Sequence, residues 1–288
     1  MEINVLRSIL VVVFVPFILN VAAGVIEENS LSAEPSRNWQ TDRGKFLDSE
    51  EVFKSMSDSA EGRKSQSGQK TDFNDAADQV LRLLLAELVD NRGVHIETAL
   101  ATVGALAGFS VQMALREAVV KTGHMAEKDV FVVVETKTGE TYYFGDALNE
   151  MLFEPREGNF SIWSLVGGAV QELGAEQQVD IKDLAGHVAD TIGGKSFGTP
   201  RLPRQHMPAK HPLELLDRFW HPIRNLLFIN TRSPLEWPLV LGLVAQKLIM
   251  QGKDAIDPGL ASKIVMEAAV PLAKVDPARV RRAFLGTQ

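Results

Sequence analysis

The sequence predicts a mainly α-helical globular domain over residues 71–288, with one β-hairpin at about 130–144. Apolar residues recur at helical spacing through most of this region, which is typical of packed amphipathic helices. β-branched and aromatic residues flank a Gly-bearing turn at the hairpin. Asp-Pro and Ser-Pro pairs, which start helices, recur through the last third. The hairpin and the short helix expected after it could equally form a small α+β insert.

The domain begins with two expected helices. Residues 71–93 are expected to form the first, because apolar residues recur every three or four positions and residues 91–93 supply a stop. The run from Val94 to Thr122 is expected to form a second, longer helix.

The middle of this longer helix, residues 99–115, carries no charge and is rich in Ala and Gly. Gly104 and Gly108 lie four positions apart, on one helix face. In a bilayer this spacing would indicate close helix dimerisation. The run is short for a membrane span, so we favour a central buried helix that lets its neighbours approach closely.

Residues 130–144 change to a strand pattern. VFVVVE at 130–135 and TYYF at 141–144 flank the sequence TKTGE, which predicts a hairpin. Asp146 is then expected to cap a short helix to about Phe153. Because a lone hairpin is marginal in water, it is expected to pack on the helices or to pair with another chain.

The rest of the chain predicts further helices. Ser233, Pro234 and Glu236 form a strong start signal, in which Ser233 caps the helix and Glu236 returns the bond as in a capping box. Pro271 could kink the helix that contains it. The expected boundaries are 161–173, 180–192, 212–230, 233–251, 258–274 and 277–285.

Composition limits the possible functions. The chain has 288 residues, a net charge of −7, 7% aromatic residues and no cysteine. The missing cysteine excludes disulfides, thiolate catalysis and Cys-ligated zinc. The net negative charge and the low aromatic content argue against nucleic acid as a partner. A local basic patch is still compatible with this overall composition.

The first 70 residues are expected to lie outside the globular domain. Residues 1–26 hold an apolar run typical of a secretory signal cleaved after Ala23, or of a membrane anchor at residues 8–26. Residues 27–70 are polar and Ser-rich, which indicates a disordered linker. A competing interpretation places the true start at Met56. That start favours a cytoplasmic protein, and an earlier one favours an exported or membrane-anchored protein.

Residues 193–212, GGKSFGTPRLPRQHMPAKHP, form a long connection that we call the basic loop. It contains no Asp or Glu, and its glycines expose backbone N–H groups to an anion. A binding site competes with two simpler interpretations: a solvated connection, and pairing of Arg201 and Arg204 with the protein's own acidic surface. The candidate residues for binding an anion or a partner are Lys195, Arg201, Arg204, His206, Lys210 and His211.

Other chemistries find little support in the sequence. GGKS at 193–196 is not a phosphate-binding loop, because position 189 is Ala where that motif requires Gly. The histidines between positions 187 and 221 lack the close helical spacing of a metalloprotease, so no metal and no cofactor are expected. Asp146 and Glu150 lie four apart, and a cap with a solvated neighbour is favoured over an acid–base pair.

Three stretches, NRGVHIETALATVGALAG, GETYYFGDALN and FGTPRLPRQH, carry a resemblance. Together they resemble an uncharacterised family of bacterial proteins, over about residues 72–288. The resemblance implies a soluble intracellular protein, which agrees with a start at Met56. It implies no activity and no catalytic residue.

Two functions from different classes are compatible with these features. The first is a non-enzymatic helical interaction or scaffold protein, which binds a protein partner or itself through the hairpin edge or the basic loop. The absence of a recognisable catalytic motif favours it. The alternative is an enzyme or binding protein for an anionic small molecule, with the basic loop as its site. Whether the protein is an enzyme stays open at this point.

Overall fold

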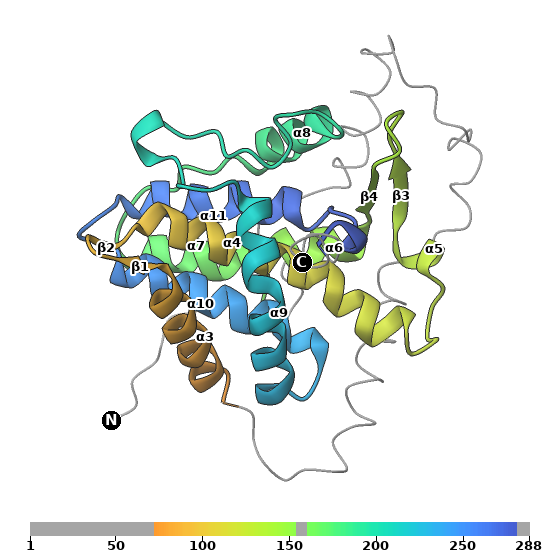
Figure 1. Cartoon of the computed structure of the whole chain (residues 1–288), viewed down its shortest axis with the longest axis horizontal. Helices are drawn as coiled ribbons and strands as arrows, with labels where there is room; N and C mark the ends of the chain where they lie inside the picture. Colours follow the sequence, from red (N-terminus) through yellow and green to blue (C-terminus); the bar gives the residue numbers. More distant parts are fainter. Residues whose placement is uncertain (1–71, 154–159, 281–288) are drawn as a thin grey trace, which may run out of the picture. The chain divides into compact units, whose positions relative to one another are not determined.

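The computed structural model describes residues 72–153 and 160–280. The expected signal or anchor at 1–26, the linker at 27–70 and the alternative start at Met56 lie outside the described residues. The described chain is mainly helical, with two small two-stranded antiparallel sheets, and this confirms the predicted fold class (Figure 1).

The first helix, α3 (Phe73–Leu88), is shorter than predicted. The prediction of one helix over 71–93 is wrong at its end, because Val89–Asp90 (β1) turns back to pair with Gly93–Val94 (β2). Gly93 permits this turn, since its φ of 107° lies in the left-handed region that favours glycine. The sequence pattern did not predict this second, very short sheet.

The next helix, α4 (Ile96–Leu115), lies in the centre of the core. The His95 side chain accepts the Thr98 N–H at its start, and a π-helical turn at Arg116–Val120 continues it. The segment Ile96–Val120 is long and apolar enough to cross a membrane, but it is buried inside the domain. The favoured prediction of a central buried helix is therefore confirmed.

Helix α4 packs closely against α11 (Pro258–Leu272). A Cβ atom at Gly104 would collide with the backbone carbonyl of Val265, and one at Gly108 would collide with that of Ala269. The two glycines therefore let the two helix backbones touch, as the sequence indicated for this face.

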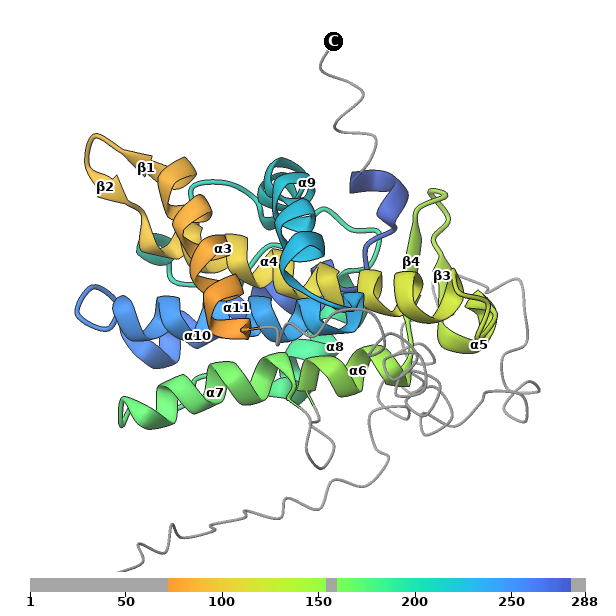
Figure 2. The ribbon, with the colours of Figure 1, turned by 90° about the horizontal axis from the view of Figure 1, so that it is seen from below.

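Four further helices pack around this pair. α10 (Trp237–Gln251) contacts α4 and lies between α3 and α7 (Ile162–Glu172), as Figure 2 shows. α9 (Pro212–Asn230) packs on α4 and α3, and α8 (Ile181–Thr191) contacts α11. The boundaries predicted for these helices hold to within a few residues.

One of the predicted proline-bearing helix starts is confirmed and another differs. The Asp-Pro pair at 257–258 begins α11, where the Asp257 side chain accepts the Leu260 N–H at 2.9 Å. Before α10, however, Ser233 caps a 3₁₀ turn at Pro234–Glu236. The Glu236 carboxylate accepts the Arg232 N–H at 2.8 Å instead of returning a bond to Ser233. The predicted capping box is therefore wrong, because a 3₁₀ turn separates the cap from the α-helix.

The predicted hairpin consists of β3 (Val132–Glu135) and β4 (Thr141–Phe144), paired antiparallel. Residue 130, expected in the first strand, instead ends the short helix α5 (Glu127–Val130). The hairpin lies at the opposite end of the described domain from β1 and β2 (Figure 1).

The hairpin is attached to the end of α11 through β4. The Tyr143 N–H donates to the Lys274 carbonyl at 2.9 Å, and Tyr142 forms an isolated antiparallel bridge with Val275. β4 thus has backbone partners on both sides, whereas β3 is the outer strand.

The Lys274 side chain reinforces this attachment from inside the core. Its ammonium nitrogen donates to Oδ1 of Asn149, on α6 (Asp146–Phe153), at 3.0 Å. The residue is only 3% exposed. Burial lowers the pKa of Lys274 to about 7, against the opposing effect of Asp146.

We expect Gly108→Ala to lower the free energy of unfolding by about 1–3 kcal/mol, because the added methyl group overlaps the α11 backbone. The matched control is Gly186→Ala in α8, where nothing lies within 4 Å of an added Cβ. Helix propensity should make that variant more stable, by up to about 1 kcal/mol. Urea unfolding measures both changes, and effects of equal sign and size would contradict the close packing of α4 on α11.

The pKa of Lys274 also predicts how stability depends on pH. The pKa is about 7 in the folded chain and 10.5 in the reference state. Between these values the unfolded chain binds a proton that the folded chain does not, so the folded chain loses stability as the pH falls. The loss is absent above pH 10.5 and complete below pH 7. Between these values the free energy of unfolding should rise by at most about 1.4 kcal/mol per pH unit. Lys274→Met should remove this contribution. Urea unfolding of both chains across this range measures it, and identical slopes would show that Lys274 is not a buried neutral amine.

Candidate functional site

The basic loop connects α8 to α9 and begins with tight turns. Gly193 and Gly198 have φ values of 70° and 73°, and a 3₁₀ turn at Arg204–His206 follows. The six residues predicted as a site have different surroundings, which decide what each can bind.

Arg201 ties the basic loop to two helices. Its Nε and Nη2 lie 3.0 and 2.8 Å from Oε1 of Glu267 on α11, and its Nη1 lies 2.7 Å from Oδ2 of Asp183 on α8. Glu267 is only 4% exposed, so the guanidinium satisfies a carboxylate that has left water. For Arg201, the structure therefore shows the internal pairing that the sequence offered as an alternative to an anion site.

His206 fastens the basic loop to the N-terminus of α4. Its Nδ1 lies 2.9 Å from Oε1 of Glu97, whose Oε2 lies 3.4 Å from Nε2 of His95. The Ala209 N–H donates to Oγ1 of Thr98 at 2.9 Å. Glu97 is buried between the two imidazoles, and its charge is favourable in the first turn of α4. His206 is thus held by the protein's own carboxylate.

Three more of the predicted cations lie at the surface. Lys210 Nζ lies 3.6 Å from Oε2 of Glu214, in an exposed pair four residues apart that contributes about 0.3–0.5 kcal/mol. Arg204 and Lys195 are exposed, and within 72–153 and 160–280 neither side chain has a charged or hydrogen-bonded partner.

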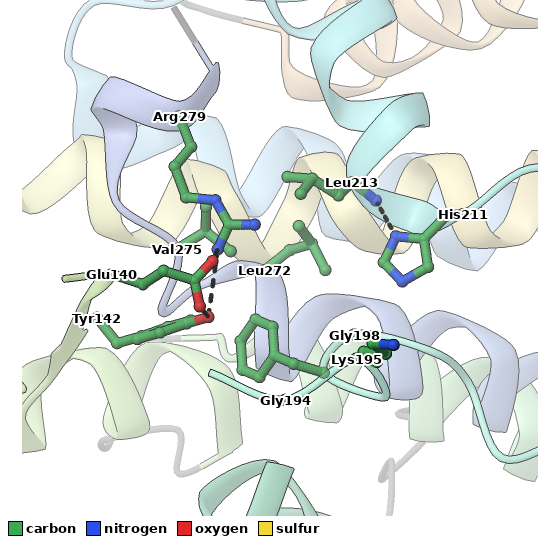
Figure 3. Close-up of a pocket in the computed structure, with 11 residues that line it drawn as sticks. Glu140, Tyr142, Gly194, Lys195, Gly198, His211, Leu213, Leu272, Val275 and Arg279 are labelled. Atoms are coloured by element: carbon green, nitrogen blue, oxygen red, sulfur yellow. Dashed lines mark hydrogen bonds and ion pairs between the residues drawn. The ribbon is translucent and has the colours of Figure 1, made fainter. Parts of the chain in front are cut away.

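Lys195 and His211, alone among the predicted residues, line a hollow of about 220 Å³. It lies between the hairpin, the basic loop, the start of α9 and the end of α11. Figure 3 shows its polar groups on two sides, with apolar side chains between them. The polar residues that line it are Glu140, Tyr142, Lys195, His211 and Arg279. We take this hollow as the candidate site.

Tyr142 joins three segments at one wall of the hollow. Its hydroxyl donates to Oε2 of Glu140 at 3.3 Å and accepts from the Gly193 N–H at 3.3 Å and from Arg279 Nη1 at 3.2 Å. Arg279 Nη1 also lies 3.3 Å from Oε1 of Glu140 (Figure 3). Burial raises the pKa of Tyr142, so its hydroxyl stays protonated at neutral pH.

His211 forms part of the opposite wall and caps α9. Its Nδ1 accepts the Leu213 N–H at 3.2 Å, and its Nε2 lies 3.3 Å from Oγ1 of Thr199. Burial lowers the pKa of His211, so the ring is neutral at pH 7. His211 therefore forms part of the wall of the hollow and contributes little positive charge to it.

Asp217 lies on α9, one helical turn beyond Leu213. Its Oδ1 is buried, and no residue in the described ranges forms a hydrogen bond with it. Burial raises the pKa of Asp217 to about 6, although the nearby Arg279 favours the charged form. Its charge at neutral pH offsets part of the positive charge of Arg279.

Glu140, Tyr142 and Arg279 are not among the residues that the sequence predicts as a site. Tyr142 belongs to a strand whose pattern the sequence did reveal, and Arg279 follows a predicted helix start. These residues come together only in the folded chain, because 137 residues separate Tyr142 from Arg279 along the sequence. Across the described ranges, no group of three or more His, Asp or Glu side chains is arranged to hold a metal ion.

No protein-family model, curated protein or solved structure matches this chain. Evidence for its function therefore comes from the geometry of its own residues.

Arg201→Gln should destabilise the protein by about 3 kcal/mol, because it leaves the buried Glu267 carboxylate without its cation. The matched control is Arg204→Gln in the same loop, which should change stability by less than about 0.5 kcal/mol. Urea unfolding at neutral pH measures both. The double variant Arg201→Gln/Glu267→Gln should recover part of the loss, and an unchanged Arg201→Gln would contradict a stabilising role for the pair.

Proposed function

We propose that this chain is a non-enzymatic interaction protein whose partner surface is the outer edge of β3. One observation carries the proposal. β3 pairs with β4 on one side, and no described residue pairs with its other side. Val132 and Val133 on this strand are 42% and 51% exposed. An unpaired strand edge with exposed β-branched residues is a template for another strand.

The hairpin register identifies which backbone groups face outward. The Thr136 N–H donates to the Glu140 carbonyl, so alternate residues of β3 bond to β4. Val133 and Glu135 are the residues between, and their N–H and C=O groups point away from β4. On the other strand, the outward Tyr143 N–H bonds to Lys274, which agrees with this register.

The partner that fits this edge is an extended segment of another protein. Val133 and Glu135 can give main-chain hydrogen bonds to an added strand, and the exposed Val132 and Val133 side chains can give it apolar contacts. Pairing with a second copy through so short an edge would bury far less than the roughly 1,200 Å² of a stable dimer. A strand-forming peptide requires less area, because backbone bonds contribute to its affinity.

The other surface that the sequence suggested for a partner receives less support. In the basic loop, Arg201 and His206 are paired with buried carboxylates of the domain itself, and Lys210 has an exposed partner. An interaction protein with this structure would therefore bind mainly through the hairpin.

Val133→Pro tests the edge directly, because proline removes an outward N–H and is tolerated in edge strands. Val133→Thr is the matched control, since it keeps the N–H group and the branched side chain. Photo-crosslinking from Val132 in cells of the source organism identifies candidate partners. A true partner should be recovered with wild type and Val133→Thr and lost with Val133→Pro.

The recovered partner should also slow hydrogen exchange at the Val133 and Glu135 amides when the purified proteins are mixed. Equal recovery with all three chains, or binding without this protection, would overturn the proposal. Light scattering of the chain alone separates self-association from binding of another protein.

A further inference from the structure

The middle of the hollow is apolar. Phe197, Leu213, Leu272 and Val275 line it. Tyr142 packs edge-on against Phe197, with the ring centroids 4.8 Å apart, and this fixes the aromatic wall. At about 220 Å³ the hollow is smaller than a site for a drug-sized molecule, so a matching ligand is small and partly apolar.

One cation at the rim of the hollow, Lys195, has no ionic partner among the described residues. Lys195 is exposed, and no acidic side chain in the described ranges pairs with it. Its flexible stem can bring three N–H donors to an anion at the mouth of the hollow. Arg279, by contrast, is fixed at one wall by Glu140 and Tyr142.

The charged side chains at the hollow favour a ligand with one negative charge. Glu140 pairs with Arg279, and the nearby Asp217 is charged above its pKa of about 6, so the positive charge of Arg279 is already offset. His211 is neutral at pH 7 because burial lowers its pKa, and Lys195 is the cation lining the hollow that has no acidic partner in the described ranges. A phosphate dianion would meet too little positive charge here, whereas a monoanion matches the single unpaired ammonium.

We propose that this hollow binds a small aliphatic monocarboxylate. The carboxylate accepts hydrogen bonds from Lys195 at the rim, and the alkyl chain packs on Leu213, Leu272 and Val275. The site is separate from the β3 edge, so it does not depend on the proposed interaction with a partner strand.

The experiment is a nuclear magnetic resonance titration of the isotope-labelled full chain with acetate, butyrate and hexanoate. Inorganic phosphate and butanol serve as comparison ligands. We expect saturable shifts at the Gly194 and Gly198 amides. Affinity should rise about threefold to fourfold per methylene group until the hollow is full. Phosphate should bind more weakly than butyrate, because it has no apolar group.

Two variants test the role of the cation. Lys195→Gln should weaken butyrate binding by at least about tenfold and leave butanol unaffected, since only the charged ligand uses the ammonium. Lys253→Gln, at an exposed lysine away from the hollow, is the matched control and should change neither. Absence of saturation, phosphate binding as tight as butyrate, or unchanged butyrate binding by Lys195→Gln would each overturn the proposal.

Discussion

The backbone contact between α4 and α11 determines where the other segments can attach. Gly104 and Gly108 face the carbonyls of Val265 and Ala269, and one turn further on Gln112 donates through Nε2 to the Ala273 carbonyl at 2.9 Å. Each step advances by four residues on both helices, so the two helices stay in register over about two turns. Because protein cores are close-packed, a side chain at either glycine could be accommodated only by moving α11 as a whole. The end of α11 carries the attachment of the hairpin, and its middle carries the partner of Arg201.

Buried polar side chains mark the places where irregular segments join this helical core. Glu97 receives His206, Glu267 receives Arg201, and Lys274 bonds to Asn149 beside the hairpin. Replacing such pairs by apolar residues is often neutral for stability, because removing charges from water offsets much of their attraction. Their specific contribution here is positional. Apolar contacts are non-directional, whereas the buried carboxylates of Glu97 and Glu267 hold the His206 ring and the Arg201 guanidinium through directional bonds.

Local signals explain what the sequence could predict. Helix caps, proline starts and the change of period at the hairpin depend on neighbours within a few residues, and the structure follows most of them. The end of α3 was placed too far along the chain because residues 91–93 indicated the stop, whereas Val89 and Asp90 already pair with Gly93 and Val94 across that turn. The roles of the basic-loop residues were harder to predict. Arg201 and His206 bond to carboxylates that lie 66 and 109 residues away in the sequence. A run of basic residues in a sequence indicates that the segment binds acidic groups. The fold is needed to show that Glu97 and Glu267 of the same domain are those groups.

The hairpin combines a rigid inner strand with an open outer one. An isolated two-stranded hairpin is marginal in water, and an edge that frays would lose conformational entropy when a partner ordered it. β4 avoids this cost because Tyr142 is buried and Tyr143 bonds to the α11 end, so β3 is presented on a fixed support. The same edge carries devices that limit aggregation: it is four residues long, and Glu135 places a charge near its end. A short, charged and well-supported edge disfavours indiscriminate strand pairing while leaving room for one matched segment.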